Sequence, residues 1–227
     1  MKVYHGSPVL FEEIDTERLS TETAVASYGH GFYTGGSPEY PREHLMKSSN
    51  EVRGGVIYEM DIPVEEGRIL QGNESVPAAT LLQAKQTALE EGNGELADYH
   101  DSLIARAETE PNFDGNEYYR SLSNLLPNQK EVSDFLVRSG IDALTSSISG
   151  GRDFILLVMN TNLLEDINLT PVETVGLGPV NPDGTRAELN LSFEEATQGP
   201  SFWDDPLGAL ENATAGITSR VTTILGR

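Results

Sequence analysis

The run Phe154–Met159 (Phe-Ile-Leu-Leu-Val-Met) is the most apolar stretch of the chain, and it constrains the fold more than any other segment. Six consecutive apolar residues are typical of a strand that is buried on both faces, because such a strand has no polar side to turn toward water. The run therefore predicts the central strand of a sheet that is covered on both sides.

Other segments predict its partner strands. In Gly55–Ile62, apolar and polar positions alternate along much of the segment, which is typical of a strand with one buried face. Three more short strands are expected: Lys2–His5, a segment that follows Gly31, and Ile141–Leu144.

Between these strands the apolar spacing is helical. It runs from Pro77 to about Arg106, and the Gly92–Gly94 segment divides it into two helices. Ser37 and Pro38 predict another helix start, with Ser37 as the N-cap. Further helices are expected at Tyr118–Leu126, before Pro127, and at Lys130–Ser139, before Gly140; a single helical turn is expected around Phe11 and Ile14; loops are expected at 64–76 and 145–152.

Short strands at both ends of a helical middle predict an α+β fold. After Ile167 the composition changes, and residues 175–206 are rich in Gly, Pro, Asp and Asn. Apolar residues then recur at helical spacing from Leu207 to Leu225. We therefore expect a domain of residues 1–172 and an extended C-terminal arm of residues 173–227 that ends in an amphipathic helix.

Composition narrows the function classes. The 227 residues carry a formal net charge of −21, which opposes binding to nucleic acid or to an anionic membrane. There is no cysteine, so disulfides and thiolate metal sites are excluded. We expect a cytoplasmic protein, since no apolar signal core or membrane-spanning run is evident. The acidic, lysine-poor surface fits a salty habitat or a basic partner.

Three short segments place chemically capable groups at strands or turns: Tyr4–Ser7, Gly29–Tyr33 and Arg152–Asp153. Taken singly, each has an ordinary structural explanation, such as a turn histidine, a core aromatic, or a loop cap. Their order and spacing together resemble the His-Tyr-Glu class of ADP-ribosyltransferases, which contains the poly(ADP-ribose) polymerases and diphtheria toxin.

The resemblance is greatest to the ADP-ribosyltransferase-like domains of phage and prophage polyvalent proteins, and it covers residues 1 to about 170. It is carried by Tyr-His-Gly-Ser at the start, by Gly-x-Gly-Phe-Tyr, by a strand like Val56–Pro63, by Tyr119-Arg120-x-Leu122, and by Gly140–Leu144. It implies a split β-sheet core, NAD⁺ as substrate, and a phage-encoded enzyme that acts in a host cell or is carried in a virion.

The resemblance also implies roles for single residues. His5 would donate to a ribose hydroxyl, and the backbone of Gly6 would pair with the nicotinamide carboxamide. Tyr33 would stack on the nicotinamide ring, and Asp153 would stabilise the positive charge that develops on the sugar. The expected catalytic residues are His5, Tyr33 and Asp153, which should lie close together; the expected NAD⁺-binding residues are His5, Gly6, Ser7, Gly31, Tyr33 and His44.

Some positions depart from the family pattern. Asp153 stands where the best-known members carry Glu, which favours single transfer or NAD⁺ hydrolysis over chain elongation. His44 replaces the second stacking aromatic residue, and Pro41 replaces a hydroxyl residue that assists the carboxamide. His44 is as readily explained as a helix-face histidine, and Asp153 as a loop cap or a partner of Arg152.

Other motifs are set aside. Glu108-Thr109-Glu110 and Thr145-Ser146-Ser147 mimic motifs of the arginine-specific transferases, but neither is expected to lie in the right strand. Gly29-x-Gly31 lacks the third glycine and the helix of a Rossmann fingerprint. The sequence shows no cluster with metal-ligand spacing, so no metal is predicted.

Two functions stay open at this stage. One is an NAD⁺-dependent mono-ADP-ribosyltransferase with an unknown protein acceptor, or an NAD⁺ glycohydrolase, acting on a host component. The other is a virion or assembly protein that has kept the fold and lost the activity, and that docks onto a partner through residues 175–227.

Overall fold

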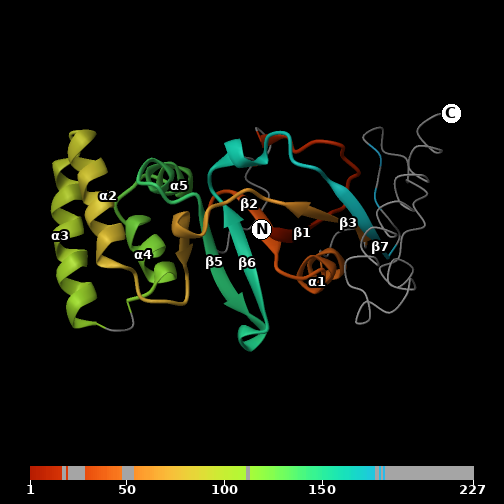
Figure 1. Cartoon of the computed structure of the whole chain (residues 1–227), viewed down its shortest axis with the longest axis horizontal. Helices are drawn as coiled ribbons and strands as arrows, with labels where there is room; N and C mark the ends of the chain where they lie inside the picture. Colours follow the sequence, from red (N-terminus) through yellow and green to blue (C-terminus); the bar gives the residue numbers. More distant parts are fainter. Residues whose placement is uncertain are drawn as a thin grey trace.

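The computed structural model describes residues 1–16, 19, 29–47, 54–110, 113–176, 179 and 181. These residues form a mixed α+β fold, as expected, with one seven-stranded sheet. Figure 1 shows α2, α3, α4 and α5 gathered at one end of the sheet, and α1 lying nearer the other end. No helix in the described ranges is long and apolar enough to cross a membrane.

The sheet has the strand order β4-β5-β6-β2-β1-β3-β7. The strands β4 and β5 are parallel, and the other neighbouring pairs in this order are antiparallel. The strand bounds are β1 Lys2–Ser7, β2 Phe32–Gly35, β3 Gly54–Asp61, β4 Ile69–Gln71, β5 Ala143–Ile148, β6 Asp153–Val158 and β7 Thr170–Gly176.

The apolar run predicted as a central strand is confirmed as β6. It lies between β5 and β2, and Ile155, Leu156, Leu157 and Val158 are all almost completely buried. Alternate side chains along a strand point to opposite faces. Leu157 accordingly joins the core beneath the helices, while Leu156 and Val158 join the core on the other face.

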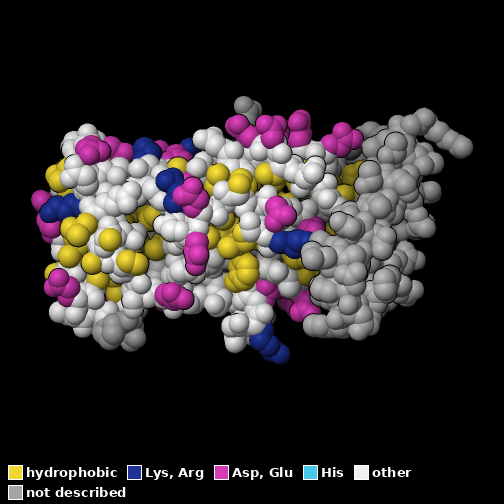
Figure 2. Space-filling view, in the orientation of Figure 1, with side chains coloured by type: hydrophobic (Ala, Val, Ile, Leu, Met, Phe, Trp, Pro, Cys, Tyr) yellow, Lys and Arg dark blue, Asp and Glu magenta, His cyan; other side chains and the backbone are white. Residues whose placement is uncertain are grey.

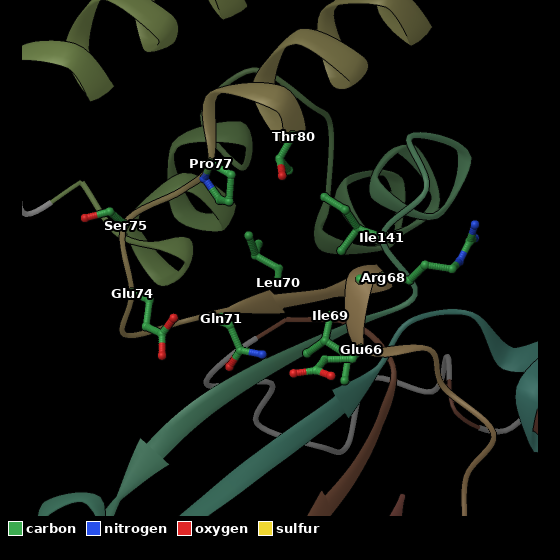
Figure 3. Close-up of a pocket in the computed structure, with 11 residues that line it drawn as sticks. Glu66, Arg68, Ile69, Leu70, Gln71, Glu74, Ser75, Pro77, Thr80 and Ile141 are labelled. Carbon is green, nitrogen blue, oxygen red and sulfur yellow. The ribbon is translucent and has the colours of Figure 1, made fainter.

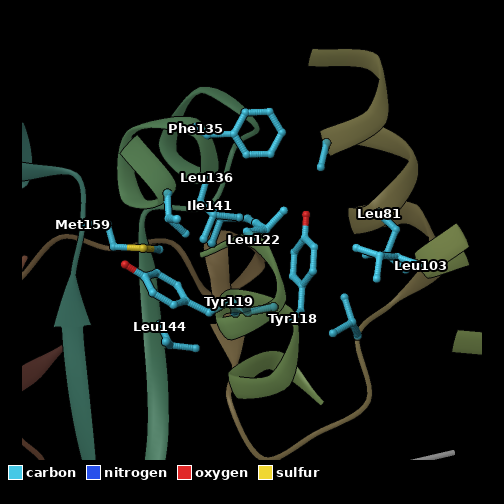
Figure 4. Close-up of a cluster of buried hydrophobic side chains, with 14 of the residues drawn as sticks. Leu81, Leu103, Tyr118, Tyr119, Leu122, Phe135, Leu136, Ile141, Leu144 and Met159 are labelled. Atoms are coloured by element: carbon cyan, nitrogen blue, oxygen red, sulfur yellow. The ribbon is translucent and has the colours of Figure 1, made fainter. Parts of the chain in front are cut away.

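The helices follow the predicted spacing closely, with bounds α1 Glu39–Lys47, α2 Ala78–Glu90, α3 Gly94–Thr109, α4 Gly115–Leu122 and α5 Gln129–Arg138. Side-chain oxygens cap three of them, since Asn93, Asp114 and Asn128 each accept a hydrogen bond from a backbone N–H in the first turn. Figure 4 shows Tyr118, Tyr119 and Leu122 of α4 packed with α5 residues near Leu144 of β5.

Some expectations about elements were wrong. The segment 145–152 is not all loop, because β5 continues to Ile148, and the segment 64–76 contains β4. The helix expected to reach Pro127 ends at Leu122, and no α-helix forms around Phe11 and Ile14.

The expected domain boundary at residue 172 falls inside β7. This strand pairs with β3 from Glu59↔Thr170 to Gly54↔Gly176, so the sheet extends to Gly176. The expected amphipathic helix at 206–225 and nearly all of the expected arm lie outside the described residues.

Candidate functional site

The sheet opens between β1 and β2 at the level of Gly6. Met1 and Ile62 exchange both backbone hydrogen bonds at the start of the β1–β3 pairing. Since such pairs recur at every second residue of an antiparallel ladder, Val3, His5 and Ser7 also turn their peptide groups toward β3. Tyr4 and Gly6 therefore turn theirs toward β2.

On that side, however, the β1–β2 ladder has one pair, Tyr4↔Gly35. Continuing the ladder would pair Gly6 with Tyr33, and no such pair forms. Gly6 thus directs its N–H and C=O toward β2 at a position where the β1–β2 ladder has no pair, which is a gap in the ladder.

His5 occupies part of this gap. Its Nδ1 lies 2.8 Å from the carbonyl oxygen of Tyr33, the oxygen that would accept from Gly6 in an unbroken ladder. A carbonyl only accepts, so Nδ1 carries the proton and Nε2 of the neutral ring is an acceptor. Burial lowers the pKa of His5, and His44 lowers it further, against the opposing effect of the Tyr33 carbonyl. The ring is therefore neutral at pH 7.

Tyr33 is held at two points. Its carbonyl accepts from His5, and its phenol donates to the carbonyl of Gly29 at 2.5 Å. Its ring packs against the core beneath the helices, whereas the His5 ring stacks on Phe32 toward the other core. The structure thus brings His5 and Tyr33 together through the backbone carbonyl of Tyr33, while their side chains belong to opposite faces.

Helix α1 covers Gly6 from the side that carries Tyr33. A Cβ added to Gly6 would lie 2.9 Å from Cβ of Pro41 and 3.1 Å from Cδ1 of Leu45, so packing alone already requires glycine here. The guanidinium of Arg42 fixes the helix by a two-point ion pair with the nearly buried Glu173 of β7, at 2.7 and 2.6 Å. His44 is exposed, and its ring lies 5.8 Å from that of Tyr40.

Asp153 lies at the other end of β2. Its carboxylate accepts from the Ser37 hydroxyl at 2.6 Å and from the backbone N–H of Phe154 at 2.8 Å. Tyr33 pairs with Leu157, four residues farther along β6, and four residues of strand span roughly 13 Å. Asp153 shares the face of Tyr33, and its carboxylate is hydrogen-bonded to Ser37 and Phe154 rather than to His5 or Tyr33.

The remaining expected binding residues serve local structure. The Ser7 hydroxyl donates to the carbonyl of Val9 at 2.7 Å and accepts from its N–H at 3.1 Å. Gly31 has a φ of +154°, and a Cβ there would collide with the carbonyl oxygen of Val158. Both residues shape the backbone next to the gap.

Of the motifs set aside, Thr145–Ser147 does lie within a strand, β5, contrary to expectation. Ser146 exchanges hydrogen bonds with Asn116, and Thr145 donates to Gln71. Glu110, from the acidic motif, accepts from Arg106 at the end of α3. Ser146 and Thr145 thus tie β5 to α4 and to β4, whereas the Arg106–Glu110 pair stays within the end of α3.

A separate cavity of about 440 Å³ lies between β4 and the start of α2. Figure 3 shows Leu70, Pro77, Thr80 and Ile141 around it. Arg68 points away from its centre and pairs with Asp142. The cavity is lined by none of the residues expected to bind NAD⁺.

One face of the molecule carries few basic side chains. Figure 2 shows hydrophobic side chains over the middle of the sheet, with Asp and Glu spread over the same face and few Lys or Arg.

In the part of the chain that the structure describes, no group of three or more His, Asp or Glu side chains is placed to hold a metal ion.

The contacts of three contributors to the site were not predicted from the sequence. Ser37 was expected as a helix cap and also holds Asp153. Tyr119 and Ser133 hold the turn that precedes β2. A hydroxyl in a helix gives no sequence signal for a partner about 90 or 100 residues away.

No family model, curated protein or solved structure matches this chain. We therefore infer function from the geometry of the site itself.

Proposed function

We propose that this protein binds NAD⁺ at the gap between β1 and β2 and is a mono-ADP-ribosyltransferase or an NAD⁺ glycohydrolase. The observation that carries the proposal is the direction of the Gly6 peptide groups. A carboxamide carries an N–H donor and a C=O acceptor side by side, which is the complement of the N–H and C=O that Gly6 presents. The resemblance of the sequence motifs assigns this pairing to the nicotinamide of NAD⁺.

The residues around the gap support the same substrate. Tyr33 is anchored at its carbonyl and its phenol, so its ring offers a fixed surface for a nicotinamide to stack on. His5 donates from Nδ1 to Tyr33, so its Nε2 would accept a hydrogen bond from a ribose hydroxyl. The resemblance implies that His5 donates a hydrogen bond to the ribose hydroxyl. In this structure His5 would instead accept a hydrogen bond from that same hydroxyl.

Asp153 would supply the chemistry of cleavage. Breaking the bond between nicotinamide and ribose builds positive charge on the sugar, and a carboxylate stabilises that charge. The Ser37 hydroxyl and the Phe154 N–H orient the Asp153 carboxylate on the face that carries Tyr33.

Asp153→Asn tests this role. The amide keeps an oxygen that can accept from Ser37 but removes the charge, so nicotinamide release from NAD⁺ by the purified full chain should fall about 100-fold or more. Asp101→Asn is the control, because this exposed carboxylate pairs with Lys85 on the helical end of the fold. Undiminished release by Asp153→Asn, with wild-type melting behaviour, would contradict the assignment.

A second candidate is a virion or assembly protein that keeps this fold without cleaving NAD⁺. The separation of Asp153 from Tyr33 favours it, as does the packing of Pro41 against Gly6. In that case residues beyond the sheet would dock onto a partner protein, and their removal would abolish binding to that partner.

A further inference from the structure

Two side-chain hydroxyls hold both backbone groups of His30. The Tyr119 hydroxyl on α4 accepts from the His30 N–H at 3.1 Å, and the Ser133 hydroxyl on α5 donates to the His30 carbonyl at 2.6 Å. The two hydroxyls lie 2.9 Å apart. Tyr119 is 5% exposed and Ser133 is fully buried, whereas His30 is half-buried, so both hydroxyls are shielded from water on the helix side.

The turn that they hold leads directly to Tyr33. Gly29, next to His30, accepts from the Tyr33 phenol at 2.5 Å. Gly29 and Gly31 have φ values of +136° and +154°, and a Cβ on Gly29 would collide with the Tyr119 ring. The turn is therefore packed tightly against α4, and a shift of the His30 backbone would move the carbonyl that anchors the Tyr33 ring.

We infer that Tyr119 and Ser133 are positioning residues for the NAD⁺ site, because they fix the Gly29–Gly31 turn and thereby the Tyr33 ring. This inference rests on the proposed function. The two hydroxyls act through the backbone of the turn. Helices α4 and α5 would therefore support the binding site directly.

The chain offers a matched control for this role. Tyr118 and Tyr119 are adjacent on α4 and both are buried, but the Tyr118 hydroxyl pairs with Nε2 of His100 at 2.9 Å, inside the helical core. Tyr118→Phe and Tyr119→Phe each delete one buried phenol oxygen. Ser133→Ala and Ser121→Ala form a second matched pair, because the Ser121 hydroxyl bonds the carbonyl of Tyr118 in its own helix.

The test is steady-state nicotinamide release from NAD⁺ by the four variants of the full chain. A loosened stacking surface weakens binding of substrate and transition state alike, so Tyr119→Phe and Ser133→Ala should raise KM about fivefold and leave kcat within about twofold. Tyr118→Phe and Ser121→Ala should lower the melting temperature without changing KM. In the absence of NAD⁺, the His30 amide should exchange faster with solvent in Tyr119→Phe and at the wild-type rate in Tyr118→Phe.

The possible results distinguish failure of the proposed NAD⁺ activity from failure of the positioning role alone. If the wild-type chain releases no nicotinamide and binds no NAD⁺, the proposed function fails and this inference fails with it. If the wild-type chain is active and Tyr119→Phe has the KM of Tyr118→Phe, the positioning role alone is overturned. An equal rise in KM for both tyrosine variants would also overturn it, because the effect would then reflect general loosening of α4.

Discussion

At the scale of single residues, recognition at the proposed site depends on peptide groups. Gly6 contributes an N–H and a C=O, and its missing side chain lets α1 pack above it. His5 contributes one ring nitrogen to the Tyr33 carbonyl and keeps the other as an acceptor. Gly6 could be singled out from the Tyr-His-Gly-Ser motif. The gap that exposes its peptide groups could not be predicted, because a four-residue motif does not determine how β1 pairs with β2.

Ligand discrimination tests this use of Gly6. Nicotinamide and nicotinic acid have the same ring, but the carboxylate of nicotinic acid has no donor and would place an anion against the Gly6 carbonyl. We expect nicotinamide to bind at least about tenfold more tightly, because a carboxylate oxygen that faces the Gly6 carbonyl loses a hydrogen bond and is desolvated without compensation. Calorimetric titration of both compounds measures the ratio. Equal affinities would show that the Gly6 N–H and C=O do not recognise the carboxamide.

At the scale of elements, strong local patterns were predicted correctly and weak ones were not. The apolar run of β6 and the alternation of β3 identified both strands, and the predicted break between two helices is confirmed, with Gly94 as the first residue of α3. The three-residue strand β4 has too few positions to show a period. Strand β7 contains Pro171 and polar residues, and it is stabilised by its pairing with β3 rather than by its own composition.

The position of β7 leads to a prediction about truncation. A chain ending at residue 172 loses the pairing of Glu173–Gly176 with β3, the buried Val175 and the partner of Arg42. It should melt about 5 °C or more below a chain ending at Gly176. Thermal melts of the two chains measure the difference, and coincident melts would contradict the structural role of β7.

The longer truncated chain also separates the two candidate functions. An enzyme should keep nicotinamide release when it ends at Gly176, because the gap, Tyr33 and Asp153 all precede that residue. Loss of release in a chain that still melts like the full protein would favour the assembly protein instead.

At the scale of the whole molecule, three histidines make stability depend on pH. Burial is the largest cause of a lowered pKa at His5, His30 and His100. His100 is fully buried, and its Nδ1 donates to the carbonyl of Leu96 while Nε2 accepts from Tyr118. The native protein therefore keeps these rings neutral at a pH where the unfolded chain protonates them.

The sign of the effect follows from proton binding. As pH falls below the unfolded value of 6.5, the unfolded chain takes up protons that the native chain does not, so the free energy of unfolding decreases. For the buried His100 the loss is at most about 1.4 kcal/mol per pH unit. Urea unfolding at pH 7.5 and 5.5 should show a smaller loss for His100→Gln than for the wild-type chain. Equal losses would mean that His100 is not protonated on unfolding in this range.

The interrupted ladder between β1 and β2 has a consequence for how such proteins diverge. A binding surface made of main-chain atoms survives substitution of most neighbouring side chains, provided that one glycine and the strand geometry persist. If Gly6 binds a carboxamide as proposed, descendants of a common ancestor could differ widely in sequence and still bind the same small molecule. Such relatives would then be recognised more readily by the position at which two strands separate than by the amino acids around it.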